Sequence, residues 1–224
     1  MKKKLLSILL CLVMVVGLLP TAAFAAGDVD INEANFPDAN FRSYVQTEFD
    51  KDGDKKLSSA EIAAVKEIIA STKGIKNLKG IEFFTALETL NCVQCELTAL
   101  DVSKNTELTR LYCWKNELTA LDVSKNTKLT RLSCWENKLK ALDVSKNTEL
   151  TSLSCGSNKL TELDVSKNTK LEMLDCESDS LLSSMRLTEL DVSQNTALKE
   201  LNCYGVKMAR KSSIWKTNFI IRVF

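Results

Sequence analysis

Leu97-Thr-Ala-Leu-Asp-Val-Ser-Lys-Asn-Thr-Glu-Leu108 is the stretch that decides the fold of this chain. Almost the same residues recur from Leu118, Leu139 and Leu160, and once more from Leu187 after a six-residue insertion. Each unit also contributes one cysteine, and the first five of these ladder cysteines are 21 residues apart: Cys92, Cys113, Cys134, Cys155, Cys176 and finally Cys203. A unit of 21 residues cannot bury its own apolar face, so neighbouring units must stack into a solenoid.

The leucines and cysteines follow the spacing Leu-x-x-Leu-x-Cys-x-x-Asn-x-Leu, which at this period is typical of leucine-rich repeats. Across residues 110 to 114, Leu111 and Cys113 alternate with polar or aromatic residues, the pattern of a strand with one buried face. The same alternation at residues 121 to 123 predicts a second short strand on the opposite side of each coil. We therefore predict an α/β fold, a right-handed leucine-rich-repeat solenoid of 21-residue, largely parallel-β coils over residues 75 to 204.

Two sets of asparagines repeat with the coils, and we predict a structural role for both. The first set follows the ladder cysteines by three residues, with Cys95 in this place in the first coil and Asp179 in the fifth: Asn116, Asn137 and Asn158. Their amides can bond backbone groups of the turn that would otherwise be buried unpaired. The second set lies in Ser-Lys-Asn-Thr or Ser-Gln-Asn-Thr stretches, which we predict to be surface turns with local backbone bonds: Asn105, Asn126, Asn147, Asn168 and Asn195.

The ladder cysteines are predicted to be buried free thiols rather than disulfides. Neighbouring strands lie about 4.8 Å apart with their Cβ vectors side by side, whereas a disulfide needs Cβ atoms about 3.8 Å apart and turned toward each other. A buried thiol packs as a small apolar group. Zinc is the alternative, because Cys92 and Cys95 have metal-type spacing, but the chain has no second such pair and no histidine.

The two ends of the chain differ from the repeats. Residues 1 to 25 contain three lysines, an apolar run from Leu5 to Leu19 and the small-residue site Ala23-Phe24-Ala25, which together predict a cleaved export signal. The run is shorter than the ~20 residues of a membrane span, so we expect no transmembrane anchor after cleavage. Residues 205 to 224 carry five basic residues, no acid and no repeat leucines, and we predict a disordered or truncated tail there.

The charge and length of the chain restrict its partners. The formal net charge is +1, and loss of the three lysines of the export signal lowers it to −2. This balance argues against nucleic acid as a partner. The remaining length fits one elongated domain with a cap. We therefore expect a monomer that is secreted or associated with the cell surface.

Residues 26 to 74 precede the repeats and are predicted to form a helical cap. Residues 38 to 49 and 59 to 70 have helical apolar spacing. Residues 50 to 61, the acidic loop, place oxygen ligands at loop positions 1, 3, 5, 9 and 12 and a hydrophobe at position 8, as in the calcium loop of an EF-hand. The predicted calcium ligands are the side chains of Asp50, Asp52, Asp54, Ser58 and Glu61 and the backbone carbonyl of Lys56.

Lys55 departs from this loop pattern, because position 6 is normally glycine. A residue other than glycine in the left-handed conformation costs about 1 kcal/mol, which lowers calcium affinity without abolishing it. The converging carboxylates would repel one another strongly unless a hard cation neutralised them. We therefore predict a calcium site of millimolar-range affinity. A solvated acidic turn between two helices is the alternative.

Residues 28 to 204 resemble the internalin-type bacterial leucine-rich-repeat proteins, in particular the cysteine-ladder internalin J group. The resemblance rests on repeats of the form Leu-Thr-x-Leu-Asp-Val-Ser-x-Asn-Thr-x-Leu-Thr-x-Leu-x-Cys behind an EF-hand-like cap. It implies a Gram-positive protein that is secreted or attached to the cell wall and acts in adhesion or in binding host molecules. Because the chain has no Leu-Pro-x-Thr-Gly sorting signal, free secretion or loss of a longer C-terminal half fits it better.

The leading functional hypothesis is recognition of an extracellular protein or glycan. The residues that flank each leucine-cysteine strand are expected to form stacked columns on the concave face of the solenoid. Tryptophan, tyrosine and arginine dominate interface energetics, and the predicted ligand-binding residues are Arg110, Tyr112, Trp114, Arg131 and Trp135. The alternative is that these aromatic residues merely cover the strand surface.

An enzyme is not expected, because the chain has no histidine, no serine elbow and no paired carboxylates outside the acidic loop. The other functional alternative is a truncated structural fragment of a larger surface protein, without independent binding activity. The unusual composition of the tail favours this alternative.

Overall fold

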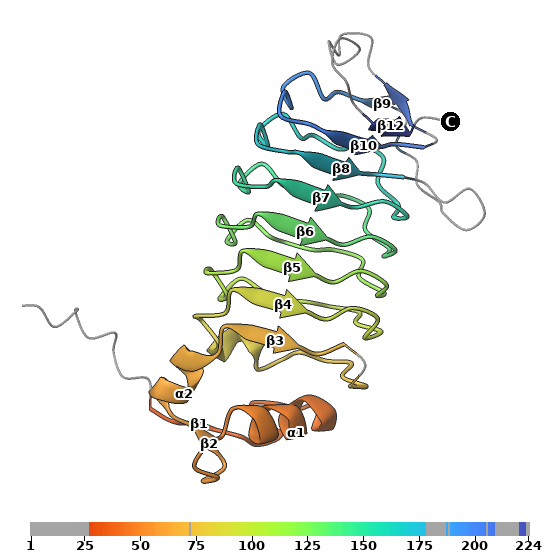
Figure 1. The fold of residues 1–224 in the computed structure, drawn as a ribbon. Coiled ribbons are helices and arrows are strands. Elements are labelled where there is room, and N and C mark those ends of the chain that lie inside the picture. The colour runs from red at the N-terminus through yellow and green to blue at the C-terminus, as the bar shows by residue number, and fades with distance from the viewer. Residues whose placement is uncertain are drawn as a thin grey trace, which may run out of the picture.

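The computed structural model describes residues 27–71, 73–177, 187, 189–204, 206–208 and 220–222. The chain forms a small cap followed by an elongated stack of coils, whose strands join in one parallel sheet (Figure 1). Among these residues no helix is long and apolar enough to cross a membrane. The predicted export signal, residues 1 to 25, lies outside the described residues.

The cap contains helix α1, Ala39–Glu48, close to the predicted helix. Asp38 starts this helix, because its side chain accepts a hydrogen bond from the Phe41 N–H at 2.9 Å. Phe41 and Val45 are both fully buried, one helical turn apart, so this face of the helix is its inner face. A short antiparallel pair completes the cap: β1 (Val29–Asp30) and β2 (Lys56–Leu57).

Helix α2, Ser59–Ala64, is shorter than the predicted helix over residues 59 to 70. A capping box of Ser58 and Glu61 starts it. After it, Glu67–Ile69 forms strand β3 and pairs with the next coil. Adjacent β-branched residues favour a strand, and the pairing decides between the two patterns. The second half of the predicted helix was therefore wrong, and the sheet begins inside the segment that we assigned to the cap.

The main sheet has eight strands in the order β12-β10-β8-β7-β6-β5-β4-β3, and all of its pairs are parallel. The repeat leucines lie opposite one another across it, as Leu90, Leu111 and Leu132 do. This arrangement confirms the predicted solenoid. The remaining elements are η1 (Ile81–Phe83), β4 (Thr89–Asn91), β5 (Arg110–Tyr112), β6 (Arg131–Ser133), β7 (Ser152–Ser154), β8 (Met173–Asp175), β9 (Glu189–Leu190), β10 (Glu200–Asn202), β11 (Lys207–Met208) and β12 (Ile220–Arg222).

The predicted second strand at residues 121 to 123 does not form. Leu121 and Val123 are buried, as the alternation indicated, but this side of the coil is a series of turns. The Asp122 carboxylate accepts a hydrogen bond from the Ser124 N–H at 2.8 Å, which closes a local turn in place of strand pairing. Alternating burial therefore occurred here without a sheet.

The ladder cysteines are fully buried and free, as predicted. Burial raises the pKa of their thiols, that of Cys134 to about 12. The thiolate is the reactive and metal-binding form of cysteine. Because burial disfavours it, the ladder acts as a column of small apolar packing groups.

The asparagines of the Ser-Lys-Asn-Thr stretches are buried rather than exposed, which corrects the prediction of surface turns. The Asn126 side-chain amide donates to the backbone carbonyls of Val102 at 2.9 Å and Asn105 at 2.8 Å, both in the preceding coil. The same two bonds recur with Asn105, Asn147, Asn168 and Asn195. These asparagines therefore join coil to coil, because the turn carbonyls of a solenoid must be satisfied by a neighbour.

Two pieces of the predicted tail, residues 205 to 224, are strands. β11 pairs with β9, and β12 pairs with β10 as the last described strand of the main sheet. The tail is therefore not disordered throughout. The rest of it lies outside the described residues, as does Asp179.

Candidate functional site

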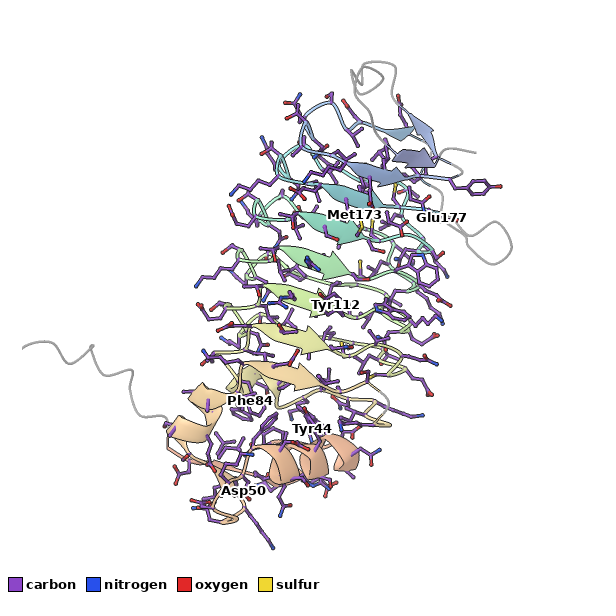
Figure 2. All side chains as sticks on the ribbon, viewed as in Figure 1. Tyr44, Asp50, Phe84, Tyr112, Met173 and Glu177 are labelled. Carbon is purple, nitrogen blue, oxygen red and sulfur yellow. The ribbon has the colours of Figure 1, made fainter. Side chains whose placement is uncertain are left out.

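The strand face is the surface formed by the outward side chains of strands β3 to β8 and of the two residues that follow each of these strands. Pairing places Arg110 beside Arg131 and Tyr112 beside Ser133, as the repeat predicted. Both arginines are exposed, whereas Tyr112 is half-buried. Tyr112 lies on β5, in the middle of the stack (Figure 2). The residues of this face differ from coil to coil, whereas those of the interior repeat.

Trp114 is fixed by contacts with the neighbouring coils. Its backbone carbonyl accepts a hydrogen bond from the Gln94 N–H at 3.1 Å. The Lys115 ammonium lies 5.4 Å from the centre of the indole ring and 3.9 Å from the Glu136 carboxylate. A cation over an aromatic ring is an attractive contact. The backbone of Trp114 is therefore joined to the preceding coil, and a cation lies beside its indole ring.

A shallow hollow of about 360 Å³ lies beside Trp114 on the strand face. It spans three successive coils, and its lining is Ser71, Asn91, Val93, Gln94, Tyr112 and Trp114. Ser71 and Val93 are small and precede Trp114 in the same column, two residues after their strands. The hollow exists because small side chains stand next to a large one.

Two of the five predicted ligand-binding residues, Tyr112 and Trp114, line this hollow. Arg110, Arg131 and Trp135 lie outside its lining. Sequence reasoning missed the lining residues of the preceding coils. The repeat could have identified them, because it places Asn91 next to Tyr112 as its strand partner in the preceding coil.

Trp135 packs toward the next coil instead. A Cβ atom on Gly156 would lie only 2.9 Å from Trp135 Cδ1 and 2.4 Å from the Glu177 carbonyl oxygen. The absence of a side chain at Gly156 therefore lets the indole and the following coil approach closely. The two predicted tryptophans thus lie in different places: Trp114 beside the hollow and Trp135 over Gly156.

The acidic loop gathers three of the predicted calcium ligands. Carboxylate oxygens of Asp50, Asp52 and Asp54 lie within 4.8 Å of one another, and Asp50 is at the tip of the cap in Figure 2. Lys55 has a φ of 66°, the left-handed conformation that position 6 requires. Among the described residues, this is the only group of three or more side chains arranged to hold a metal ion.

Glu61 is not part of that group. One of its oxygens accepts from the Lys51 N–H at 2.6 Å, and the other accepts from the N–H and hydroxyl of Ser58 at 2.8 and 2.7 Å. These bonds, above all the Lys51 N–H, lower the pKa of Glu61. Lys56 is paired with Asp30 in the short sheet. The residues of the loop therefore fit calcium through three aspartates, while Glu61 serves the capping box.

Comparison with known proteins agrees with this geometry. No protein-family model matches the chain. Over 71 residues, 32% of the chain, it is 41% identical to internalin J of Listeria monocytogenes serotype 4b. The solved functional domain of Listeria monocytogenes internalin J, which includes a cysteine ladder, matches 83% of the chain at 40% identity with a TM-score of 0.74. The chain is an internalin J homologue.

The chain spans less than half of the internalin J proteins that it matches. It covers 40% of the solved internalin J domain, and the aligned segment is 8% of the full internalin J sequence. Internalin C2 of the same species shares the fold, with a TM-score of 0.64 at 18% identity over 91% of this chain and all of that one. The internalin-like fold supports a role in interaction or adhesion.

Proposed function

We propose that the internalin J homologue is an exported recognition module that binds an extracellular protein or glycan through its strand face. The hollow beside Trp114 carries this proposal. It combines two aromatic side chains, Tyr112 and Trp114, with polar side chains on a rigid sheet. Aromatic anchors in such a setting contribute most of the energy of a typical interface.

Neighbouring side chains extend this contact surface. Ile69 is 43% exposed, the only exposed large hydrophobic residue among the described ones, and pairs with Asn91 at the edge of the hollow. On the other side of Tyr112, Arg110 and Arg131 stand side by side, and neither forms an ion pair with a described residue. Two unpaired guanidinium groups are suited to an acidic group of a partner. The face thus offers apolar, polar and cationic contacts together.

Export from the cell is part of this proposal. The composition of residues 1 to 25 supports it. We propose that the chain acts as a monomer outside the cell, either free or associated with the cell surface. The solenoid supplies recognition and no catalytic role is assigned to it.

Binding of the mature chain to an array of extracellular proteins and glycans tests this function. The Tyr112→Ala, Trp114→Ala double variant should lose at least about thirtyfold in affinity, because hot-spot truncation costs about 2 kcal/mol or more. The matched control is Lys104→Ala, Lys125→Ala, two exposed positions on the opposite side of the coils. If the parent binds no component, or the double variant binds as the parent does, the proposal is wrong and the structural-fragment alternative gains support.

We also propose that the acidic loop binds calcium weakly, on the basis of the three clustered aspartates. Calcium prefers oxygen ligands, and extracellular modules bind it with dissociation constants of about 0.1 to 1 mM. At about 100 times the dissociation constant, calcium should stabilise the cap by about 2.7 kcal/mol. Thermal melting with and without calcium measures this shift.

Two variants sharpen the calcium test. Asp52→Asn removes the charge of an exposed member of the cluster and should abolish the shift. It should disturb the loop little, since among the described residues the Asp52 side chain accepts one hydrogen bond, from the Asp54 N–H at 3.2 Å. Glu61→Gln should weaken the shift if Glu61 turns to the ion. A parent that melts identically at every calcium concentration would show that the loop is only a turn.

A further inference from the structure

We infer that the hollow beside Trp114 binds one uncharged sugar ring of a glycan. This assignment rests on the proposed function of the strand face and gives it a ligand class. Four features of the hollow carry it: its aromatic walls, its free amide groups, its lack of charge and its rigid support. Its volume of about 360 Å³ lies in the range of small-ligand sites.

The aromatic walls suit the C–H face of a pyranose. Tyr112 and Trp114 both line the hollow and are half-buried, so part of each ring remains accessible. Sugar C–H groups carry a partial positive charge and are attracted to the negative face of an aromatic ring. Lys115, which lies over the Trp114 ring, is not part of the lining. The hollow and the lysine therefore meet different parts of the indole.

The polar groups of the lining suit sugar hydroxyls. The Asn91 side-chain oxygen accepts from the Val93 N–H at 3.3 Å, and its NH₂ group makes no hydrogen bond to the described residues. The Gln94 side-chain amide makes none either, while its backbone N–H is bound to Trp114. A side-chain amide offers a donor and an acceptor side by side. Adjacent hydroxyls of a sugar ring present the complementary pair.

The lining contains no charged residue. Lys115, which follows Trp114 in the chain, lies beside the Glu136 carboxylate and the indole ring. An anionic group would therefore find no counter-charge in the hollow itself. A purely apolar side chain of a peptide would leave the amides of Asn91 and Gln94 without hydrogen-bond partners, which disfavours such a ligand. A neutral ring with hydroxyl groups meets both conditions.

The backbone under the hollow is held rigidly. The Cys92 N–H donates to the Tyr112 carbonyl at 2.9 Å, and the Gln94 N–H donates to the Trp114 carbonyl at 3.1 Å. Gln94 has a φ of 55°, so the backbone forms a tight left-handed turn at this position. Side chains on ordered backbone lose less entropy when a ligand binds. The site is therefore formed before the sugar arrives.

Intrinsic fluorescence of the mature chain tests this inference with methyl glycosides of neutral hexoses and N-acetylhexosamines as probes. The chain has three tryptophans, so Trp135→Phe, Trp215→Phe leaves Trp114 as the reporter. At least one glycoside should change its emission saturably, with a dissociation constant of about 1–10 mM. In this background Asn91→Ala and Gln94→Ala should each weaken binding about tenfold or more. The matched control Lys104→Ala should bind as the parent does.

Two outcomes would overturn the inference. One is no saturable response to any glycoside below about 100 mM while N-acetyl-leucinamide, an apolar peptide probe, binds. The other is binding of a methyl hexuronoside, which carries a carboxylate, that is tighter than binding of every neutral glycoside and weakens more than about tenfold between low and high salt, because this indicates an anionic ligand. If a glycoside binds but the Tyr112→Ala, Trp114→Ala variant binds the array as the parent does, the proposed function is wrong. If that variant loses binding to the array but no glycoside binds the hollow, only the present inference is wrong.

Discussion

The cap and the solenoid of this chain are stabilised in different ways. The cap packs against the first coil through an aromatic cluster, in which Phe36 of the cap contacts Phe41 at 5.8 Å and Phe84 of the first coil at 6.4 Å between ring centres. The core of the coils after Phe84 contains only leucine, valine and cysteine among its buried described apolar residues. The cap therefore depends on contacts that occur once, whereas each coil uses the same small set again.

Their hydrogen bonds differ in the same way. In the cap, the single Asp38 carboxylate accepts from Phe41, Lys76 and Asn77, and so ties α1 to the start of the solenoid. In the solenoid, the side chain of each buried repeat asparagine donates to a backbone carbonyl of the preceding coil. In the solenoid, stability is a sum of similar terms, one for each pair of neighbouring coils. In the cap, a contact such as that of Asp38 has no second copy elsewhere in the structure. The two regions should therefore respond differently to pH and to mutation.

Alkaline pH should produce the largest effect and should act on the solenoid. The pKa of a ladder thiol is raised by burial, to about 12 for Cys134, from about 8.5 in the unfolded chain. This stabilisation is complete below the unfolded-state pKa and is lost as the pH rises from there toward the folded pKa. In that window, each buried thiol should lower the free energy of unfolding by about 1.4 kcal/mol for each unit by which the pH rises. Urea unfolding under reducing conditions from pH 7 to 10 measures it.

The cap is the internal control for this prediction, because residues 26 to 74 contain no cysteine. Amide exchange followed by mass spectrometry should show that the coils open first as the pH rises. Cys134→Ala should remove the contribution of one thiol, and so make the free energy of unfolding fall less steeply as the pH rises. An unfolding midpoint that is constant up to pH 10 would contradict the assignment of the ladder as buried, protonated thiols.

Substitution of the asparagines comes next in size. Asn116 is fully bonded: its oxygen accepts from Cys95 and Leu97, and its NH₂ donates to Cys92 and Cys113. Asn116→Ala leaves these buried groups without partners, at about 1–3 kcal/mol for each orphan group, and should destabilise the solenoid by several kcal/mol. Urea unfolding at pH 7 gives the value.

Asn126→Ala should cost less than Asn116→Ala. It orphans two carbonyls, but the Asn126 oxygen is itself buried without a hydrogen-bond partner among the described residues. Removing that oxygen offsets part of the loss. Lys125→Ala, at an exposed neighbour, is the matched control and should stay within about 0.5 kcal/mol of the parent. A larger loss of unfolding free energy for Asn126→Ala than for Asn116→Ala would contradict this account of the bonding.

A smaller effect is expected in the cap. Ser58→Ala removes the capping box of α2 and should cost about 1 kcal/mol. Ser43→Ala is the control, because Ser43 is exposed within α1 and alanine favours helix. Thermal melting of both variants, without calcium, isolates the cap contribution. Equal melting of Ser58→Ala and Ser43→Ala would show that the box adds nothing to stability.

The smallest effect on stability is expected at the strand face. Trp114→Ala removes a half-buried side chain that lies outside the solenoid core, so the free energy of unfolding should change by less than about 1 kcal/mol. Circular dichroism and urea unfolding measure it. A loss as large as that for Asn116→Ala would assign Trp114 to the structure of the coil and would weaken its role as a binding residue.

Sequence reasoning predicted the interior of the solenoid and the first helix of the cap, and it failed where long-range pairing decides. Leu111 and Cys113 were assigned correctly because every coil repeats the same alternation. Residues 65 to 70 fit a helix as well as a strand by spacing alone, and only pairing with β4 selects the strand. Asn126 was expected to bond its own turn. Its actual partner, the Val102 carbonyl, lies 24 residues earlier in the chain, and only the stacking of the coils brings the two together.

The sequence by itself determined the period of the coils and the leucine and cysteine positions of their interior. This was possible because each coil meets only its neighbours, so one motif specifies nearly all core contacts. The tertiary structure alone decided the end of α2 and the position of the hollow. The hollow depends on unequal side chains, Val93 beside Trp114 and Asn91 beside Tyr112, which come from successive coils and follow no repeat. Their combined shape exists only when the coils are stacked.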